Sequence, residues 1–153
     1  MYGADKEFDS RLENEITMLA LEDKEVRLYS VRRSVDEMLC TASYNGHFTL
    51  VKLLVEKVSS KYHYSTALVW AASKGYMEIA KLLLTVYTNV NELKEASIRM
   101  IAECGQVEAM KLLFDSGLSK TKINSHVIDT AYKYNRYGMI ELFKEYGINA
   151  ERN

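Results

Sequence analysis

Residues 66–84, TALVWAASKGYMEIAKLLL, contain the pattern that decides the fold. Gly75 divides this stretch into two short segments. In the second segment Ile79, Leu82 and Leu83 follow the i, i+3, i+4 spacing of one helix face. Glycine tolerates the left-handed backbone that closes many helices. The stretch therefore predicts a helix, a tight turn at Gly75 and a second helix.

The same pattern occurs three more times, in residues 42–54, 101–113 and 131–143. The four turn positions lie 29, 30 and 30 residues apart, and they are Gly46, Gly75, Gly105 and Asn135. An apolar residue recurs seven positions before each turn, as Leu39, Leu68, Ile98 and Ile128. Small residues that let paired helices approach closely recur three or four positions before it, as Ala42, Ala71, Ala72, Ala102 and Ala131.

The apolar triplet of the second segment also recurs, as Leu50, Leu53, Leu54, then Ala109, Leu112, Leu113, then Met139, Leu142, Phe143. A unit of about thirty residues cannot bury such a face alone, so the units must stack on one another. We therefore expect an all-α solenoid of about four helix-turn-helix repeats.

The central unit resembles an ankyrin repeat. The residues that match the family pattern are Thr66, Leu68, Ala71, Ala72, Gly75, Glu78, Ile79, Leu82 and Leu83. Asn89-Val90-Asn91 is similar to the Asp-x-Asn that often follows, and Thr66-Ala67-Leu68-Val69 stands where the family has Thr-Pro-Leu-His. The resemblance covers roughly residues 34–150 and implies a protein-binding role for the chain.

The repeats are shorter than the roughly 33 residues of a regular ankyrin repeat. The missing residues belong between units, where the family makes its β-hairpin. We therefore expect short or absent hairpins, nearly pure helix and individually weak repeats. The predicted units are approximately residues 34–62, 63–92, 93–122 and 123–153.

Both ends carry features expected of an open stack. Residues 1–33 are predicted to form a tail followed by a capping helix, or alternatively a degenerate first repeat, because Leu12, Ile16 and Leu19 have helical spacing. Gly147 is predicted to stop the last helix.

The composition argues against several classes of function. The chain has 20 Lys and Arg against 21 Asp and Glu, which gives no general basic surface for nucleic acid or an anionic membrane. The first eight residues do not resemble a signal peptide, and no apolar run is long enough to span a bilayer. The two cysteines, Cys40 and Cys104, do not form a disulfide-rich pattern, which fits a reduced cytoplasmic location.

No constellation of catalytic or metal-binding residues emerges from the sequence. The seven glycines never adopt a phosphate-loop spacing. His47, His63 and His126 are far apart, and neither cysteine belongs to a zinc-binding pair. We therefore predict no catalytic residue, no metal and no cofactor, and a protein that is not an enzyme.

The register of the ankyrin resemblance predicts a partner-binding surface on the concave face. Its candidates stand just before the turns or between the units. They are Arg33, Asp36, Tyr44, Asn45, Tyr62, His63, Ser73, Lys74, Glu92, Glu95, Glu103, Lys133 and Tyr134. Their mixed charges favour a protein partner over a phosphate backbone. Trp70, in the first helix of its unit, is expected to pack within or between repeats.

These features lead to one main hypothesis and one alternative. The main hypothesis is a non-catalytic module that occludes, scaffolds or sequesters a protein partner. Short, proline-free repeats of this kind resemble those of large DNA viruses, bacteriophages and intracellular bacteria, which suggests an antagonist of a host factor. The alternative is a structural protein that self-assembles into a homo-oligomer through its stack ends or its tyrosines.

Overall fold

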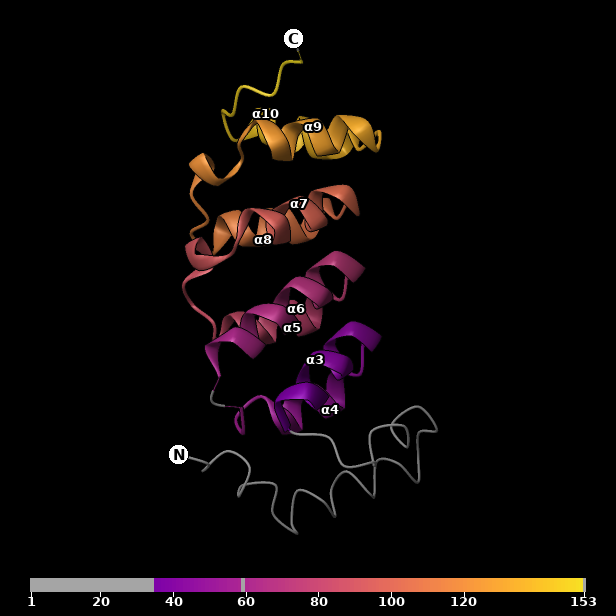
Figure 1. The fold of residues 1–153 in the computed structure, drawn as a ribbon, viewed down its shortest axis with the longest axis vertical. Helices are drawn as coiled ribbons and strands as arrows, with labels where there is room; N and C mark the ends of the chain where they lie inside the picture. The colour runs from indigo at the N-terminus through magenta and orange to yellow at the C-terminus, as the bar shows by residue number, and fades with distance from the viewer. Residues whose placement is uncertain (1–34, 59, 153) are drawn as a thin grey trace.

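The computed structural model describes residues 35–58 and 60–152, and these form four helix pairs with no β-strand. The pairs are α3 (Val35–Asn45) with α4 (Phe48–Leu54), α5 (Lys61–Lys74) with α6 (Met77–Leu84), α7 (Glu95–Glu103) with α8 (Val107–Asp115), and α9 (Ser125–Lys133) with α10 (Tyr137–Glu145). The pairs stack in chain order along the long axis of the molecule (Figure 1). The predicted all-α solenoid is therefore confirmed.

The turn within each pair has the left-handed backbone that the sequence pattern predicts. The φ angles are +77° at Gly46, +79° at Gly75, +70° at Gly105 and +57° at Asn135. The next backbone N–H bonds back across the turn, for example from Tyr76 to the Ala71 carbonyl at 2.9 Å. These bonds satisfy carbonyls that the end of the first helix would otherwise leave without a partner.

Neighbouring repeats also meet at these turns. The side chain that follows each turn leans over the turn glycine of the preceding repeat, so that a Cβ at Gly75 would lie 2.8 Å from Gln106 Oε1. Arg136 covers Gly105 in the same way, and its Nε donates to the Glu103 carbonyl at 2.7 Å. The left-handed backbone favours glycine or asparagine at the turns, and at Gly75 and Gly105 a flexible side chain of the next repeat packs directly over the glycine.

Packing runs from each pair only to its neighbours. First helices contact first helices in the order α3, α5, α7, α9, and second helices contact second helices in the order α4, α6, α8, α10. The apolar residues seven positions before each turn are all buried, as are the recurring alanines. This arrangement of short-range contacts is what a linear repeat protein requires.

The buried stripe of the second helices differs from the predicted i, i+3, i+4 triplet. In α6 the buried residues are Ile79, Ala80 and Leu83, whereas Leu82 is half-buried. Leu53 and Leu112 are also half-buried, and only the last repeat buries the equivalent Leu142. Each second helix packs against its own first helix and against neighbouring second helices. The buried face of α6 is therefore rotated relative to the predicted one, so that Ala80 is buried in place of Leu82.

Short connections replace the hairpins of longer ankyrin repeats, as predicted. Two 3-10 turns, η2 (Val90–Glu92) and η3 (Lys120–Lys122), precede α7 and α9. Asn91 joins one connection to the next: its Nδ2 donates to the Gly117 carbonyl at 2.9 Å and its Oδ1 accepts from the Ser119 N–H at 2.7 Å. The connections lie along one edge of the stack and the tight turns along the other (Figure 1).

The ends of the predicted units can be compared only in part. The expected capping helix or degenerate repeat at residues 1–33 lies outside the described residues. Helix α5 already begins at Lys61, inside the first predicted unit. At the other end α10 stops at Glu145, and Gly147 has a φ of +77°, as expected for a helix stop. None of the described helices is both long and apolar enough to cross a membrane.

Candidate protein-binding surface

The first helices α3, α5, α7 and α9 leave one side uncovered by their second helices, and we call this side the first-helix surface. On α5 it includes Tyr62, Thr66, Trp70 and Lys74, which are spaced four residues apart and therefore lie on one face of the helix. The residues at the Trp70 position of the other repeats are Thr41, Met100 and Thr130, and all four are half-buried. The surface thus crosses the repeats as a series of parallel helix faces.

An aromatic cluster with a cation lies on this surface where α3 meets α5. The rings of Tyr44 and Trp70 contact each other edge to face, with centroids 5.0 Å apart. The ammonium of Lys74 lies 4.6 Å from the centroid of the Tyr44 ring. Tyr44 keeps 39% of its surface exposed, so it can contribute both to packing and to a binding contact.

A groove of about 290 Å³ runs between α5 and α7. Val69, Trp70, Leu93 and Met100 supply its apolar wall. Its remaining lining residues are Tyr62, Ser65, Thr66, Glu92, Lys94 and Ser97. Tyr62 is 68% exposed at one end of the groove. Concave apolar surfaces with a few polar groups at the rim are typical binding sites.

The acidic residue of this groove is already paired within the protein. Lys61 Nζ lies 2.9 Å from Glu92 Oε2, and Asn89 Nδ2 donates to Glu92 Oε1 at 3.2 Å. The hydrogen bond from Lys61 lowers the pKa of Glu92 below its ordinary value and raises the pKa of the Lys61 ammonium. Glu92 therefore stays ionised, and its charge is largely compensated by Lys61.

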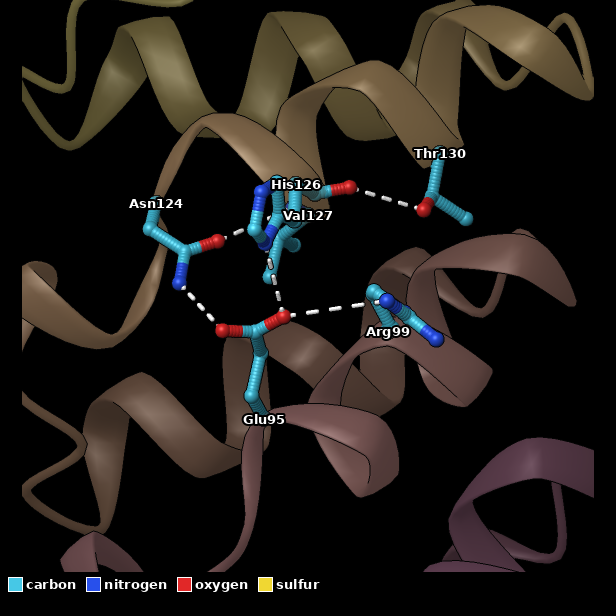
Figure 2. A network of polar contacts seen from close by, with 6 residues as sticks. All are labelled: Glu95, Arg99, Asn124, His126, Val127 and Thr130. Atoms are coloured by element: carbon cyan, nitrogen blue, oxygen red, sulfur yellow. Dashed lines mark hydrogen bonds and ion pairs between the residues drawn. The ribbon is translucent and has the colours of Figure 1, made fainter.

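Glu95 is the centre of a polar network between the third and fourth repeats (Figure 2). Its Oε2 accepts from Asn124 Nδ2 at 2.7 Å, and its Oε1 lies 3.1 Å from His126 Nδ1 and 3.7 Å from Arg99. The hydrogen bonds from Asn124 and His126 lower the pKa of Glu95. Asn124 also caps α9, because its Oδ1 accepts from the Val127 N–H. One carboxylate thus fixes the start of α9 against the start of α7.

The predicted site residues fall into three groups in the structure. The residues with exposed side chains are Tyr44, Asn45, Tyr62, Lys74, Glu103, Lys133 and Tyr134. The residues whose polar groups join one repeat to the next are Asp36, His63, Glu92 and Glu95; His63 Nδ1, for example, lies 3.6 Å from Asp36 Oδ2. Arg33 lies outside the described residues.

Ser73 is the third group, and its burial is a correction to its predicted place on the partner-binding surface. It is only 5% exposed, so it cannot contribute contact area to the surface. Glu103 and Lys133 occupy the same place in their repeats and are exposed. The reason is length: the longer side chains extend past their neighbours into solvent, whereas a serine at the same position remains beneath them.

Two members of the surface were not among the predicted binding residues. Trp70 packs between repeats, as expected, but it also lines the groove, and Met100 lines the same groove from α7. Their position, five residues before the turn, is one of four, spaced four residues apart on α5, that share an outward helix face. The four-residue spacing on α5 could have indicated this outward face. However, apolar side chains at helical spacing are more often in the core than on the surface.

Two observations on the described residues bear on reaction chemistry. Burial, with Asp36 and Glu37 nearby, raises the pKa of the Cys40 thiol to about 11, which keeps it protonated and unreactive near neutral pH. Within residues 35–58 and 60–152, no cluster of His, Cys, Asp and Glu could hold a metal ion. What the arrangement offers is contact area and a few fixed charges.

Comparison with known proteins gives a family but no individual relative. The family model described as "Ankyrin repeats (3 copies)" matches residues 12–94 and, in a second overlapping match, residues 38–126. No curated protein and no solved structure matches the chain. The two family matches together span residues 12–126, which is more than half of the chain and includes the first three described helix pairs, so the chain belongs to the ankyrin-repeat family.

Proposed function

We propose that this chain is a non-catalytic module that binds a protein partner with its first-helix surface and acts by occupying the partner's own surface. Ankyrin repeats generally mediate protein–protein interaction. The single observation that carries the proposal is the cluster of Tyr44, Trp70 and Lys74 beside an open apolar groove. Aromatic side chains with apolar bodies and polar tips are enriched where proteins bind one another.

The mixed charge of the surface supports a protein partner over a nucleic acid. Lys74 and Lys133 are exposed on it together with Glu103, and the chain as a whole is nearly neutral. A phosphate backbone would favour several cations without interspersed carboxylates. A protein surface can match both signs of charge.

The test compares two sets of alanine substitutions in affinity purification from the native cells. The first combines Tyr44→Ala, Lys74→Ala and Tyr134→Ala on the first helices. The control combines Lys111→Ala on α8 and Tyr137→Ala on α10, which are exposed residues of the second helices. We expect the first set to lose partners that the wild type and the control retain. Equal recovery by all three proteins would count against the proposal.

The more specific version of this function is antagonism of a host factor. It predicts that a partner recovered in this way loses its own activity when the chain is bound. Self-assembly into a homo-oligomer stays the alternative, and light scattering across micromolar concentrations separates the two. A strictly monomeric species would exclude self-assembly.

A further inference from the structure

The groove between α5 and α7 has an apolar wall and an exposed lysine, Lys94, among its lining residues. Val69 and Leu93 are almost completely buried in that wall, whereas Trp70 and Met100 remain half-exposed. The hydroxyls near Tyr62 are already used, because Ser65 and Thr66 donate to the Tyr62 carbonyl at 2.7 and 3.0 Å. The wall therefore selects an apolar side chain.

The charge left at the groove is positive. Glu92 is compensated by Lys61 at 2.9 Å. Lys94, an exposed lining residue, forms no ion pair with any described residue. Lys74 contacts the Tyr44 ring of α3, and neither Lys74 nor the exposed Glu103 of α7 lines the groove. Lys94 is thus available to a ligand, and no uncompensated carboxylate among the described residues lines the groove.

The length of the surface limits the size of the ligand. Tyr62 and Lys74 are twelve residues apart on α5, which corresponds to ~18 Å along the helix. An extended peptide covers this distance with about five or six residues. A segment of that length can place one side chain against Trp70 and Met100 and a neighbouring side chain near Lys94.

We propose that this groove binds a short extended segment of a protein partner in which a bulky apolar side chain lies next to a carboxylate. The apolar side chain lies against Trp70 and Met100, and the carboxylate faces Lys94. The inference rests on the proposed function and specifies the chemistry of the partner. Recognition combines removal of apolar surface from water with charge complementarity at the rim.

The test is an NMR titration of the isotope-labelled full chain with two capped peptides at millimolar concentration. The first peptide has phenylalanine between aspartate and glutamate, and the second has the same phenylalanine between two lysines. We expect the acidic peptide to shift the Trp70 indole and Met100 methyl signals, and the basic peptide to shift neither. Equal shifts with both peptides, shifts confined to other residues, or no shift with the acidic peptide would overturn the inference.

A charge reversal provides the matched control. Lys94→Glu should weaken binding of the acidic peptide by about three- to tenfold, because it replaces an exposed attraction by a repulsion. Lys111→Glu makes the same change on α8, away from the groove, and should leave affinity unchanged. Signals elsewhere in the spectrum report whether each variant is folded. Equal affinity of the two variants would overturn the role of Lys94.

The failure of this inference is distinguishable from failure of the proposed function. A captured protein that depends on Tyr44, Lys74 and Tyr134 but ignores both Lys94→Glu and the competing acidic peptide would keep the protein-binding role and remove the partner chemistry. Loss of that dependence on the first-helix residues would instead remove the proposed function itself.

Discussion

Trp70 packs edge-on against Tyr44 of the preceding repeat and also lines the groove toward the following one. The sequence predicts that Trp70 packs within or between repeats, but it identifies neither Tyr44 as its neighbour nor the groove that Trp70 lines. Val69 and Ala71 on either side are apolar, so periodicity alone cannot separate a core side chain from a half-exposed one at the edge of the buried stripe. Exposure at this edge depends on the distance between α5 and α7. These helices belong to different repeats, so the pattern of one repeat cannot predict it.

The two leucines of α6 provide a test of the buried stripe. Leu83 is fully buried and Leu82 is half-buried. Leu83→Ala should therefore lower the free energy of unfolding by about 2–5 kcal/mol, since it leaves a cavity as well as losing apolar contact. Leu82→Ala should cost less, about 1 kcal/mol, because part of its side chain already meets solvent. Urea unfolding measures both, and equal losses would contradict the assignment.

The turns provide a second test at single positions. Gly75 has a φ of +79°, so Gly75→Ala should destabilise the protein by about 1–2 kcal/mol through left-handed strain. The nearby Gln106 side chain can move aside and adds little. Asn135→Gly, at the equivalent turn, should leave stability nearly unchanged because asparagine already adopts this conformation there. Thermal melts compare the pair, and a neutral Gly75→Ala would contradict the strained-turn explanation.

At the scale of elements, helix pairs are joined by contacts between successive connections. The short spacing of the repeats predicted that hairpins would be missing, and η2 and η3 confirm this. The resemblance also singled out Asn91, but its bonding partners could not be predicted. Gly117 and Ser119 lie 26 and 28 residues away, and the shortened connections have no counterpart in the regular family pattern.

Removing the Asn91 side chain should therefore weaken the junction between the second and third connections. Asn91→Ala leaves the Ser119 N–H without its acceptor and should cost about 1–3 kcal/mol in unfolding free energy. Asn149→Ala is the control, because Asn149 accepts only from the exposed N–H of Glu151. The two variants can be ranked by urea midpoints. A smaller loss for Asn91→Ala than for Asn149→Ala would show that the bridge contributes nothing.

The Glu95 network predicts a dependence of stability on pH. The folded pKa of Glu95 lies below its ordinary value, so its stabilising contribution is present above that value and is lost as the pH falls through the folded pKa. Glu95→Gln should be less stable than wild type at pH ~7, and the difference should shrink toward pH ~3 as the wild-type carboxylate is protonated.

The control for this pH experiment is Glu108→Gln on α8. Glu108 is exposed and forms no ion pair with a described residue, so removing its charge should change stability little at either pH. Urea unfolding at the two pH values gives the comparison. A constant difference between Glu95→Gln and wild type across this range would contradict the role assigned to the carboxylate.

At the scale of the whole molecule, the stack follows from repeats that cannot bury their apolar faces alone. This was predictable because the helix-turn-helix pattern recurs four times in the sequence at nearly constant spacing. The surface was predictable in part. Tyr44, Lys74 and Tyr134 are exposed as expected, but Ser73 is buried and Glu92 and Glu95 join repeats together. Those outcomes depend on contacts between repeats, which the register of one repeat does not record.

The consequence for function is that two sides of one stack should behave differently toward a partner. The first-helix surface carries the groove and the aromatic cluster, whereas the second helices present their own exposed residues on the other side. Tyr62 on α5 and Tyr137 on α10 form a matched pair for this comparison, with 68% and 61% of their surfaces exposed.

The most direct measurement is photo-crosslinking in the native cells with p-benzoylphenylalanine in place of Tyr62 or of Tyr137. Both substitutions exchange one exposed aromatic side chain for another, so the fold should be preserved equally. We expect a discrete protein adduct from position 62 and none from position 137. An adduct from position 137 alone, or the same adduct in equal yield from both positions, would contradict binding through the first-helix surface.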